Sequence, residues 1–235
     1  MSENISKVSY SEKIGEKHYN LKFVLLIFIL SAGLFYLVRF FEDNTYQIFI
    51  MDHYLVFHTI VEYVSIVMYI ASFLVIYYTG ERENSVRMII TATALFFVAL
   101  IDFWHTFSYS GMPGLLVGSS VQAATAFWII GRMGFAVGIL AGTFVPIEVK
   151  GKLKNRLLYV LVPFLFSLVF LIYISYYPET FPALFIEGQG LTGTKQLMEI
   201  GIILIMSLAF IKLFLEYKKD SRNTLALFLG ALIIS

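Results

Sequence analysis

Long apolar runs are the feature that most constrains this chain, because they recur along nearly its whole length. A hydrocarbon core about 30 Å thick needs about 20 residues of helix, and in lipid a helix satisfies its own backbone hydrogen bonds. The sequence therefore predicts an all-α, polytopic transmembrane helix bundle with six complete helices. The runs are Phe23–Phe41, Tyr54–Thr79, Met88–Tyr109, Val121–Val145, Leu157–Tyr176 and Thr194–Phe214.

A seventh apolar run begins at Thr224 and reaches only to Ser235. It is too short to span, so we expect it to be the start of a seventh helix. Either the helix continues in a longer natural protein, or the sequence was truncated inside it. The composition agrees with a lipid environment, since hydrophobic residues make up 59% of the 235 residues and charged residues only 14%. A soluble domain carries about 25% charged residues.

The polar segment of residues 1–22 is too long and too mixed in charge for a signal peptide. Nearly all basic residues fall on one side of the predicted bundle, and Lys195 is the main exception. The positive-inside rule therefore predicts a cytoplasmic amino-terminal segment, residues 1–22, and a multi-pass domain, residues 23–235, in the cell (inner, cytoplasmic) membrane. The basic residues on that side are the lysines of residues 1–22, Arg82, Arg87 and those within 150–156 and 218–222.

Ionisable residues inside these runs gather in the outer half of the predicted bundle. His58 and Glu62 lie four residues apart on one face of the second helix, and Asp102 and His105 lie three apart near the outer end of the third. Arg132 lies near the middle of the fourth helix, as the expected partner of Glu62 or Asp102. An ionisable group costs about 2.5–3.5 kcal/mol in hydrocarbon and is tolerated where it faces a partner or a cavity. The convergence predicts a functional site.

Two cofactors fit these residues, and a third interpretation needs none. Side by side, His58, Glu62, Asp102 and His105 would offer two nitrogens and two carboxylate oxygens to a divalent transition metal such as zinc, iron or manganese. Spread apart, His58 and His105 would be the axial ligands of a haem b, with the carboxylates orienting the rings. Without either cofactor, the cluster is a structural hydrogen-bond network.

Several chemistries are not expected of this chain. It contains no cysteine, which excludes disulfides and thiolate metal sites. We find no nucleophile beside a base, no phosphate-binding loop and no nucleotide-binding motif, so we expect no catalysis. The net charge of +1 gives no reason to expect nucleic acid as a partner. The expected partners are membrane lipids and a small ligand of unknown identity.

Four motifs, taken in order, give the chain a family resemblance. They are Phe57–Glu62, Leu100–Thr106 with Tyr109, Trp128-Ile129 with Arg132, and Ile186–Thr192. In this order they resemble the third type of membrane-associated sensor domain (MASE class) of bacteria and archaea, from about Tyr54 to the chain end. Domains of that class are input modules placed ahead of histidine kinase or diguanylate cyclase modules, and their ligands are poorly defined.

The resemblance implies that residues 23–235 are an integral membrane sensory input domain of a prokaryotic signal-transduction protein, with the output domain absent. We expect a homodimer formed through that output domain. The buried acids and histidines leave two alternatives open, a proton or ion transporter and a haem- or metal-binding membrane redox protein. The further side chains expected to contact a ligand or to complete the polar network are Trp104, Thr106, Tyr109, Trp128, Arg132, Glu187 and Glu199.

Overall fold

The computed structural model describes residues 54–116, 118–146, 148–151 and 157–219, with side chains up to 216, and most residues between 25 and 40. The chain divides into two compact units, residues 52–207 and residues 1–51 with 208–235. In the latter unit, the described residues between 25 and 40 are helical and lie inside the predicted span Phe23–Phe41. The bounds of that helix and the predicted helix from Thr224 lie outside the described residues.

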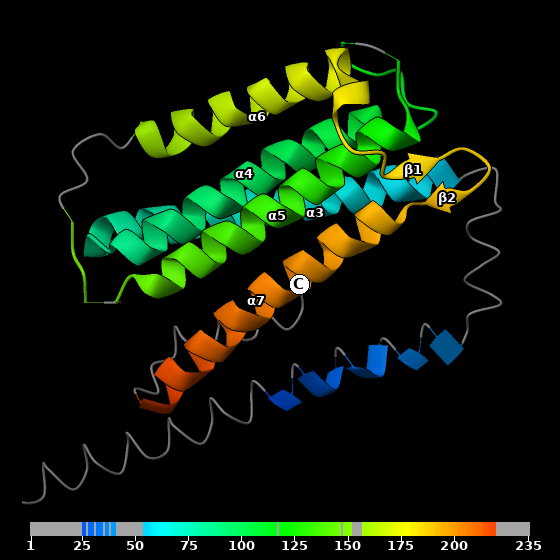
Figure 1. The fold of residues 1–235 in the computed structure, drawn as a ribbon. Helices are drawn as coiled ribbons and strands as arrows, with labels where there is room; N and C mark the ends of the chain where they lie inside the picture. Colours follow the sequence, from blue (N-terminus) through cyan, green and yellow to red (C-terminus); the bar gives the residue numbers. More distant parts are fainter. Residues whose placement is uncertain are drawn as a thin grey trace, which may run out of the picture. The chain divides into compact units, whose positions relative to one another are not determined.

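Five helices of the described residues are long and apolar enough to cross a membrane, which confirms an all-α polytopic bundle. The predicted bounds of the middle three agree with the structure within two residues. The first and the last of the five continue by four and five residues beyond their predicted ends, into charged sequence, because Glu, Lys and Arg are good helix formers. The helices are α3 (Tyr54–Glu83), α4 (Val86–Ser108), α5 (Val121–Phe144), α6 (Leu158–Tyr176) and α7 (Gly193–Lys219) (Figure 1).

A turn of only two residues, Asn84 and Ser85, joins α3 to α4. Asn84 has a φ of 55°, in the left-handed region that asparagine tolerates better than most residues. Ser85 is the N-cap of α4, and its hydroxyl accepts a hydrogen bond from the Met88 N–H at 3.5 Å. The turn is tied to the segment after α5, because Ser85 and Lys150 form an antiparallel bridge and the Gly151 N–H donates to the Asn84 carbonyl at 3.0 Å.

Arg87 also joins these two segments. The sequence placed it in a loop, whereas the structure places it in the first turn of α4 with only 4% of its surface exposed. Its Nε–H donates to the Val145 carbonyl at 2.7 Å, just after the end of α5. A cation is favourable at a helix carboxyl terminus, where the backbone carbonyls lack intrahelical partners. Arg87 is therefore a cap for α5.

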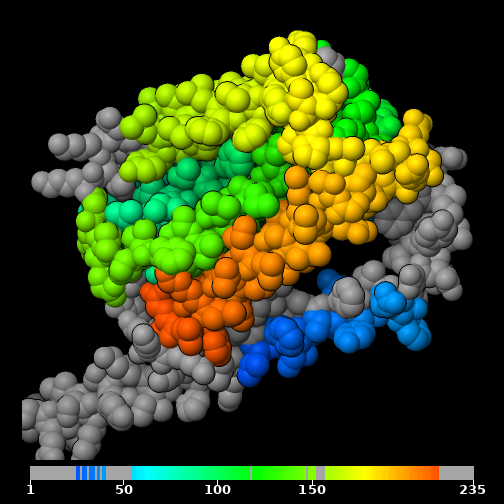
Figure 2. All heavy atoms as spheres, in the orientation of Figure 1, coloured from blue at the N-terminus to red at the C-terminus, as the bar shows by residue number. Residues whose placement is uncertain are grey.

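The central helix of residues 52–207 is α4, which packs against α3, α5 and α6. In the space-filling view it shows only as a narrow band between α6 and α5 (Figure 2). The contact with α5 is close because α5 presents glycines to it, and a Cβ on Gly138 would overlap the Cβ of Ala94. Small residues allow such an approach of helix backbones in membranes. The facing pairs are Gly131 with Ile101, Gly134 with Phe97, Gly138 with Ala94, and Gly142 with Thr91.

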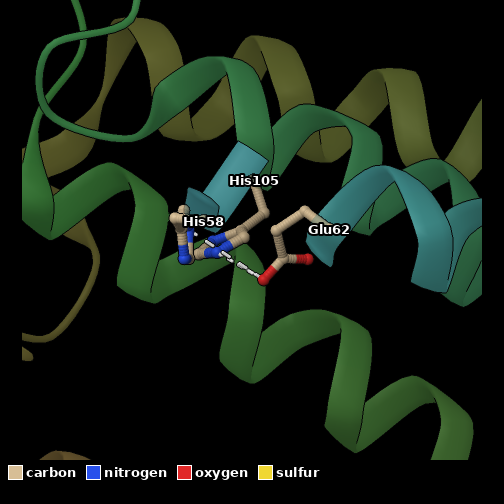
Figure 3. A group of neighbouring side chains, drawn as sticks. All are labelled: His58, Glu62 and His105. Carbon is tan, nitrogen blue, oxygen red and sulfur yellow. Dashed lines mark ion pairs between the residues drawn. The ribbon is translucent and has the colours of Figure 1, made fainter. Parts of the chain in front are cut away.

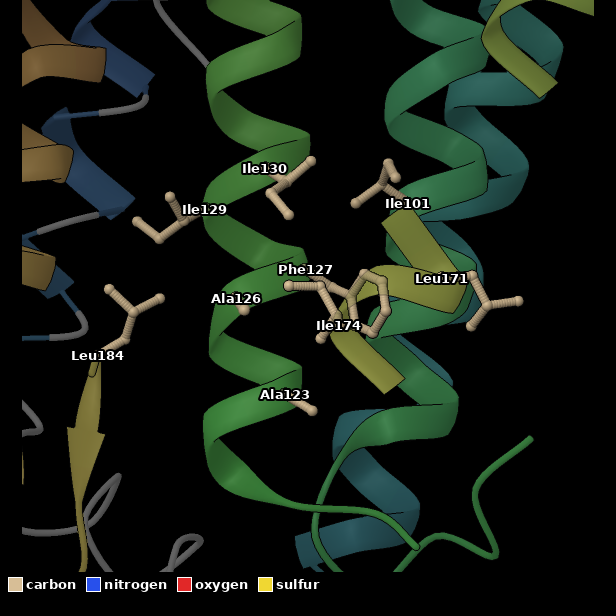
Figure 4. Packing of buried hydrophobic residues seen from close by; sticks show 9 residues of the cluster. All are labelled: Ile101, Ala123, Ala126, Phe127, Ile129, Ile130, Leu171, Ile174 and Leu184. Atoms are coloured by element: carbon tan, nitrogen blue, oxygen red, sulfur yellow. The ribbon is translucent and has the colours of Figure 1, made fainter. Parts of the chain in front are cut away.

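Buried apolar side chains from α4, α5 and α6 form one cluster around Phe127, which is fully buried (Figure 4). Leu184, from the segment between α6 and α7, is also fully buried in it. The cluster therefore joins three helices and a connecting segment. Its other members are Ile101, Ala123, Ala126, Ile129, Ile130, Leu171 and Ile174.

The connection from α6 to α7 contains a short 3-10 helix, η1 (Pro178–Thr180), and an antiparallel pair of strands, β1 (Phe185–Ile186) and β2 (Gly190–Leu191). The strands were not predicted. Gly188 and Gly190 have φ values of 78° and 88°, which explains the glycines of this motif. Gln122 of α5 holds the segment, since its Oε1 accepts from the backbone N–H groups of Leu184 and Phe185 at 2.9 and 3.0 Å. We call this end of residues 52–207, where α3 and α5 begin and α4 ends, the hairpin end.

Candidate functional site

Three ionisable side chains meet at the hairpin end (Figure 3). His58 and Glu62 come from α3, and His105 comes from the last turn of α4. Within the part of the chain that the structure describes, they form the group of His and acidic residues whose donor atoms all lie within 4.8 Å of one another. Glu62 Oε1 lies 3.7 Å from His105 Nε2 and 4.0 Å from His58 Nε2. A single carboxylate oxygen therefore faces both imidazoles.

The orientation of His105 is fixed from its other side. Its Nδ1 lies 2.7 Å from the backbone carbonyl of Ala124 in α5. A carbonyl only accepts, so Nδ1 carries a proton and donates it. In the neutral ring, Nε2 is then a lone pair that faces the Glu62 carboxylate. Two electron-rich atoms at this separation repel, so a positive charge, either a proton or a cation, belongs between them.

The three side chains are largely buried, with exposed fractions of 18% for His58, 15% for Glu62 and 7% for His105. The ring of Tyr109 lies 4.2 Å from that of His58, centroid to centroid, and Tyr54 stacks on His58 at 5.8 Å. His58 Nε2 is buried, and it has no hydrogen-bond partner among the described residues. The site therefore holds a donor or acceptor position that the described protein atoms leave unsatisfied.

Asp102 lies one turn before His105 but does not join this group. It is fully buried, and its Oδ2 lies 3.5 Å from Nη2 of Arg132 in α5. Arg132 Nη1 donates to the Tyr69 hydroxyl at 2.6 Å, and the guanidinium lies 5.7 Å from the Trp128 ring centroid. Of the two acids expected to pair with Arg132, the structure selects Asp102. Of the four residues that the sequence grouped as possible metal ligands, the structure brings together His58, Glu62 and His105 and places Asp102 beside Arg132.

The other predicted site residues have local roles or lie apart. Thr106 donates its hydroxyl to the Asp102 carbonyl at 2.8 Å, and the Trp104 ring packs in an apolar cluster. Glu187 is exposed in the turn between β1 and β2. Glu199 forms an ion pair with Lys195, one turn earlier in α7. Within the described residues, neither Glu187 nor Glu199 contacts the histidine cluster.

Two partners in this region were missed from the sequence. Tyr69 lies seven residues after Glu62, so it shares a face of α3 with Glu62, and that spacing could have indicated it. The Ala124 carbonyl is a backbone atom, and nothing in the identity of residue 124 indicates that it accepts from His105. The polar groups of α3 and α4 were recognised by their chemistry, whereas their backbone partner was not.

Apolar spanning helices with ionisable groups collected near one end define a multi-pass membrane protein that contains a buried polar site. The model of the MASE3 family, described as a membrane-associated sensor domain, matches residues 49–235. The chain therefore belongs to this family, which confirms the resemblance found in the motifs and makes the chain a sensor domain of signalling proteins. Neither the curated proteins nor the solved structures gave a match. None of these findings favours a transporter or a redox protein.

Proposed function

We propose that the chain is the signal-input domain of a histidine kinase or diguanylate cyclase in the cytoplasmic membrane, and that it reads its stimulus around His58, Glu62 and His105. The observation that carries this proposal is the meeting of three ionisable groups from two helices of an apolar bundle. Ionisable groups are costly inside a membrane, and stability of the fold gives little reason to place three of them together. In a domain whose family senses, they are the candidate receptor.

The position of the group supports access from outside the bilayer. The 30 residues of α3 give a length of about 45 Å, against about 30 Å of hydrocarbon. His58 lies one turn after the start of α3, close to the membrane boundary. With the amino terminus cytoplasmic, as the basic residues favour, this is the outer boundary. A small ligand or ion reaches it without crossing the membrane.

Transmission needs no catalysis by this chain. A ligand that binds one arrangement of α3 and α4 more tightly than another shifts the balance between the two arrangements. Helix shifts of this kind alter the orientation of an attached domain. A homodimer joined through its output domains then converts the shift into kinase or cyclase activity.

The reading frame that encodes the chain tests the output. We expect a kinase or cyclase module after residue 235, and a stop codon soon after it would contradict the proposal. In membranes that contain the complete protein, Glu62→Gln should change phosphorylation or cyclic dinucleotide synthesis severalfold at unchanged protein level. Glu179→Gln is the matched control, since Glu179 is an exposed carboxylate of η1 outside the cluster. Equal output from both variants and the parent would also contradict the proposal.

A further inference from the structure

We infer that His58, Glu62 and His105 bind one divalent first-row transition cation, of the Zn²⁺ or Fe²⁺ kind, across α3 and α4. The inference deepens the proposed function and rests on it for its biological meaning, because occupancy of the site would then be the stimulus. The site itself is argued below from its donors, their spacing, their orientation and their charge.

The donors are two imidazole nitrogens and one carboxylate oxygen. Two histidines with one glutamate hold zinc in sites that keep an open coordination position, and two histidines with one carboxylate hold non-haem Fe²⁺ with open positions. Both are sites whose metal still accepts a water or a small ligand. A receptor needs such a vacancy, whereas a purely structural zinc site fills all four positions.

The spacing is close to that of a coordination shell. Metal–nitrogen and metal–oxygen bonds of about 2.0–2.2 Å put neighbouring donors of a tetrahedron about 3.3–3.5 Å apart. Glu62 Oε1 lies 3.7 Å from one Nε2 and 4.0 Å from the other. All three donor atoms lie within 4.8 Å of one another, so side-chain rotation has to bring them together by up to about 1.5 Å to match such a shell.

The surroundings of His105 also suit a metal ligand. Metal-bound histidines nearly always donate their second ring N–H to a carbonyl or carboxylate, which fixes the tautomer and the direction of the lone pair. His105 donates Nδ1–H to the Ala124 carbonyl at 2.7 Å, and so directs its Nε2 lone pair at Glu62. Asp102 is paired with Arg132, which leaves Glu62 as the acid of this group.

A single proton is a poorer solution for the same geometry. Placed between Glu62 and His105, it leaves His58 Nε2 without a partner, and that atom is buried and unsatisfied among the described residues. Burying an unsatisfied polar group is unfavourable. A cation between the three donors satisfies both nitrogens and the carboxylate together.

The same distances favour a small cation over haem. Axial haem ligands lie on opposite faces of a macrocycle, whereas both Nε2 atoms here lie within 4.0 Å of one carboxylate oxygen. The ring centroids of His58 and His105 are 5.8 Å apart. A haem between them would have to displace the Glu62 side chain. The position of Glu62 therefore favours a single ion over a haem.

Cobalt titration tests the inference, because Co²⁺ reports its ligands through visible absorption. The 235-residue chain is purified in lipid nanodiscs, stripped with a chelator and titrated with Co²⁺, then with Zn²⁺ and, under anaerobic conditions, Fe²⁺ in competition. We expect one equivalent of Co²⁺, displaced by the preferred natural metal. His58→Ala, His105→Ala and Glu62→Gln should each raise Kd by about 100-fold or more, since changes to outer partners alone cost 10–100-fold.

A control variant and a check of folding complete the test. Glu179→Gln, which alters an exposed carboxylate of η1 outside the cluster, should leave Kd unchanged. Glu62→Gln keeps the shape of the side chain, so its thermal unfolding shows whether a loss of binding is a loss of fold. Absence of stoichiometric binding by the folded chain, binding that Glu62→Gln leaves unchanged, or a Soret band from equimolar haem would each overturn the metal site.

These outcomes are separate from the test of the input function. If the chain binds no metal but Glu62→Gln still changes the output of the complete protein, the metal site is overturned and the proposed input function remains supported. A chain that binds one metal, while the output ignores the same substitution, supports the metal site and contradicts the proposed function.

Discussion

Two neighbouring residues of α4 compensate their burial in different ways. His105 faces Glu62 of α3 and donates to α5, whereas Asp102 pairs with Arg132 of α5. Three residues of helix turn the direction of a side chain by about 300°, so a one-turn spacing still leaves an offset of about 60°. The spacing therefore predicts proximity along the helix, and the neighbouring helix decides the partner. This is why Asp102, which the sequence grouped with the other three side chains, lies apart from them.

The pairing of Arg132 with Asp102 predicts a strongly destabilised variant. Arg132→Leu leaves a fully buried carboxylate without its cation, and the loss of one partner from a buried ion pair costs about 3–5 kcal/mol. We expect a lower midpoint of thermal unfolding in detergent or nanodiscs. Arg82→Gln, an exposed arginine at the far end of α3, is the control and should change the midpoint little.

A double-mutant cycle isolates the pair from other effects of the substitution. Arg132→Leu combined with Asp102→Asn should destabilise less than the sum of the two single changes, because the second change removes the charge that the first exposes. Independent sites add within about 0.3–0.5 kcal/mol. Simple additivity would show that the two residues are not coupled.

Among the helices, apolar length proved the most reliable signal. It gave the bounds of α4, α5 and α6 within two residues, because about 20 apolar residues have few alternatives in lipid. It failed at Glu83 and Lys219, where α3 and α7 end, since charge marks the membrane boundary and not the end of a helix. The strands β1 and β2 escaped notice because four residues of strand carry no period.

The site was predictable in its chemistry and less so in its geometry. His58, Glu62 and His105 were recognisable because ionisable side chains stand out in apolar helices, and the two-residue turn and antiparallel packing of α3 and α4 bring them together. The Ala124 carbonyl, which accepts from His105, was not recognisable, since every residue has a backbone carbonyl. Contacts between helices depend on rotation about their axes, which an isolated sequence does not specify.

The close packing of α4 on α5 predicts opposite results for two glycines. Gly138→Ala places a Cβ where that of Ala94 already lies, so the helices must separate, and overpacking costs about 1–3 kcal/mol. Gly201→Ala meets nothing within 4 Å on α7 and should be neutral or stabilise by up to about 1 kcal/mol. Thermal unfolding of both variants measures the difference. Equal midpoints would mean that the glycines do not set the distance between α4 and α5.

At the scale of the whole molecule, orientation in the membrane determines what the site senses. Arg87 is a helix cap inside the protein, which removes one charge from the solvated basic residues, but Arg82 and Lys150 remain exposed at the same end. Charges near the ends of spanning segments set the orientation. That end is therefore expected in the cytoplasm, and the hairpin end outside.

Reporter fusions check this orientation directly. A reporter fused after Lys152, which lies outside the described residues, should be cytoplasmic, and one fused after Gly190 of β2 should be external. Alkaline phosphatase and green fluorescent protein give complementary signals for the two sides. The reverse pattern would put the histidine cluster at the cytoplasmic boundary and rule out a stimulus that arrives from outside the cell.

The two-residue turn joins α3 and α4 at one end, so a change in the angle between the helices moves their opposite ends the most. The turn is tied to the segment after α5 by the bridge between Ser85 and Lys150, and a connection of two residues limits how far the helices can slide along each other. His58 lies 25 residues before Glu83, which is roughly 37 Å from the turn along α3 at 1.5 Å per residue. An increase of about 10° in the angle between the helices would therefore separate them at His58 by about 6 Å. A contact between α3 and α4 at His58 and His105 would thus lie where the distance between the helices changes most. Its formation would depend on the angle between the helices more strongly than a contact near the turn could.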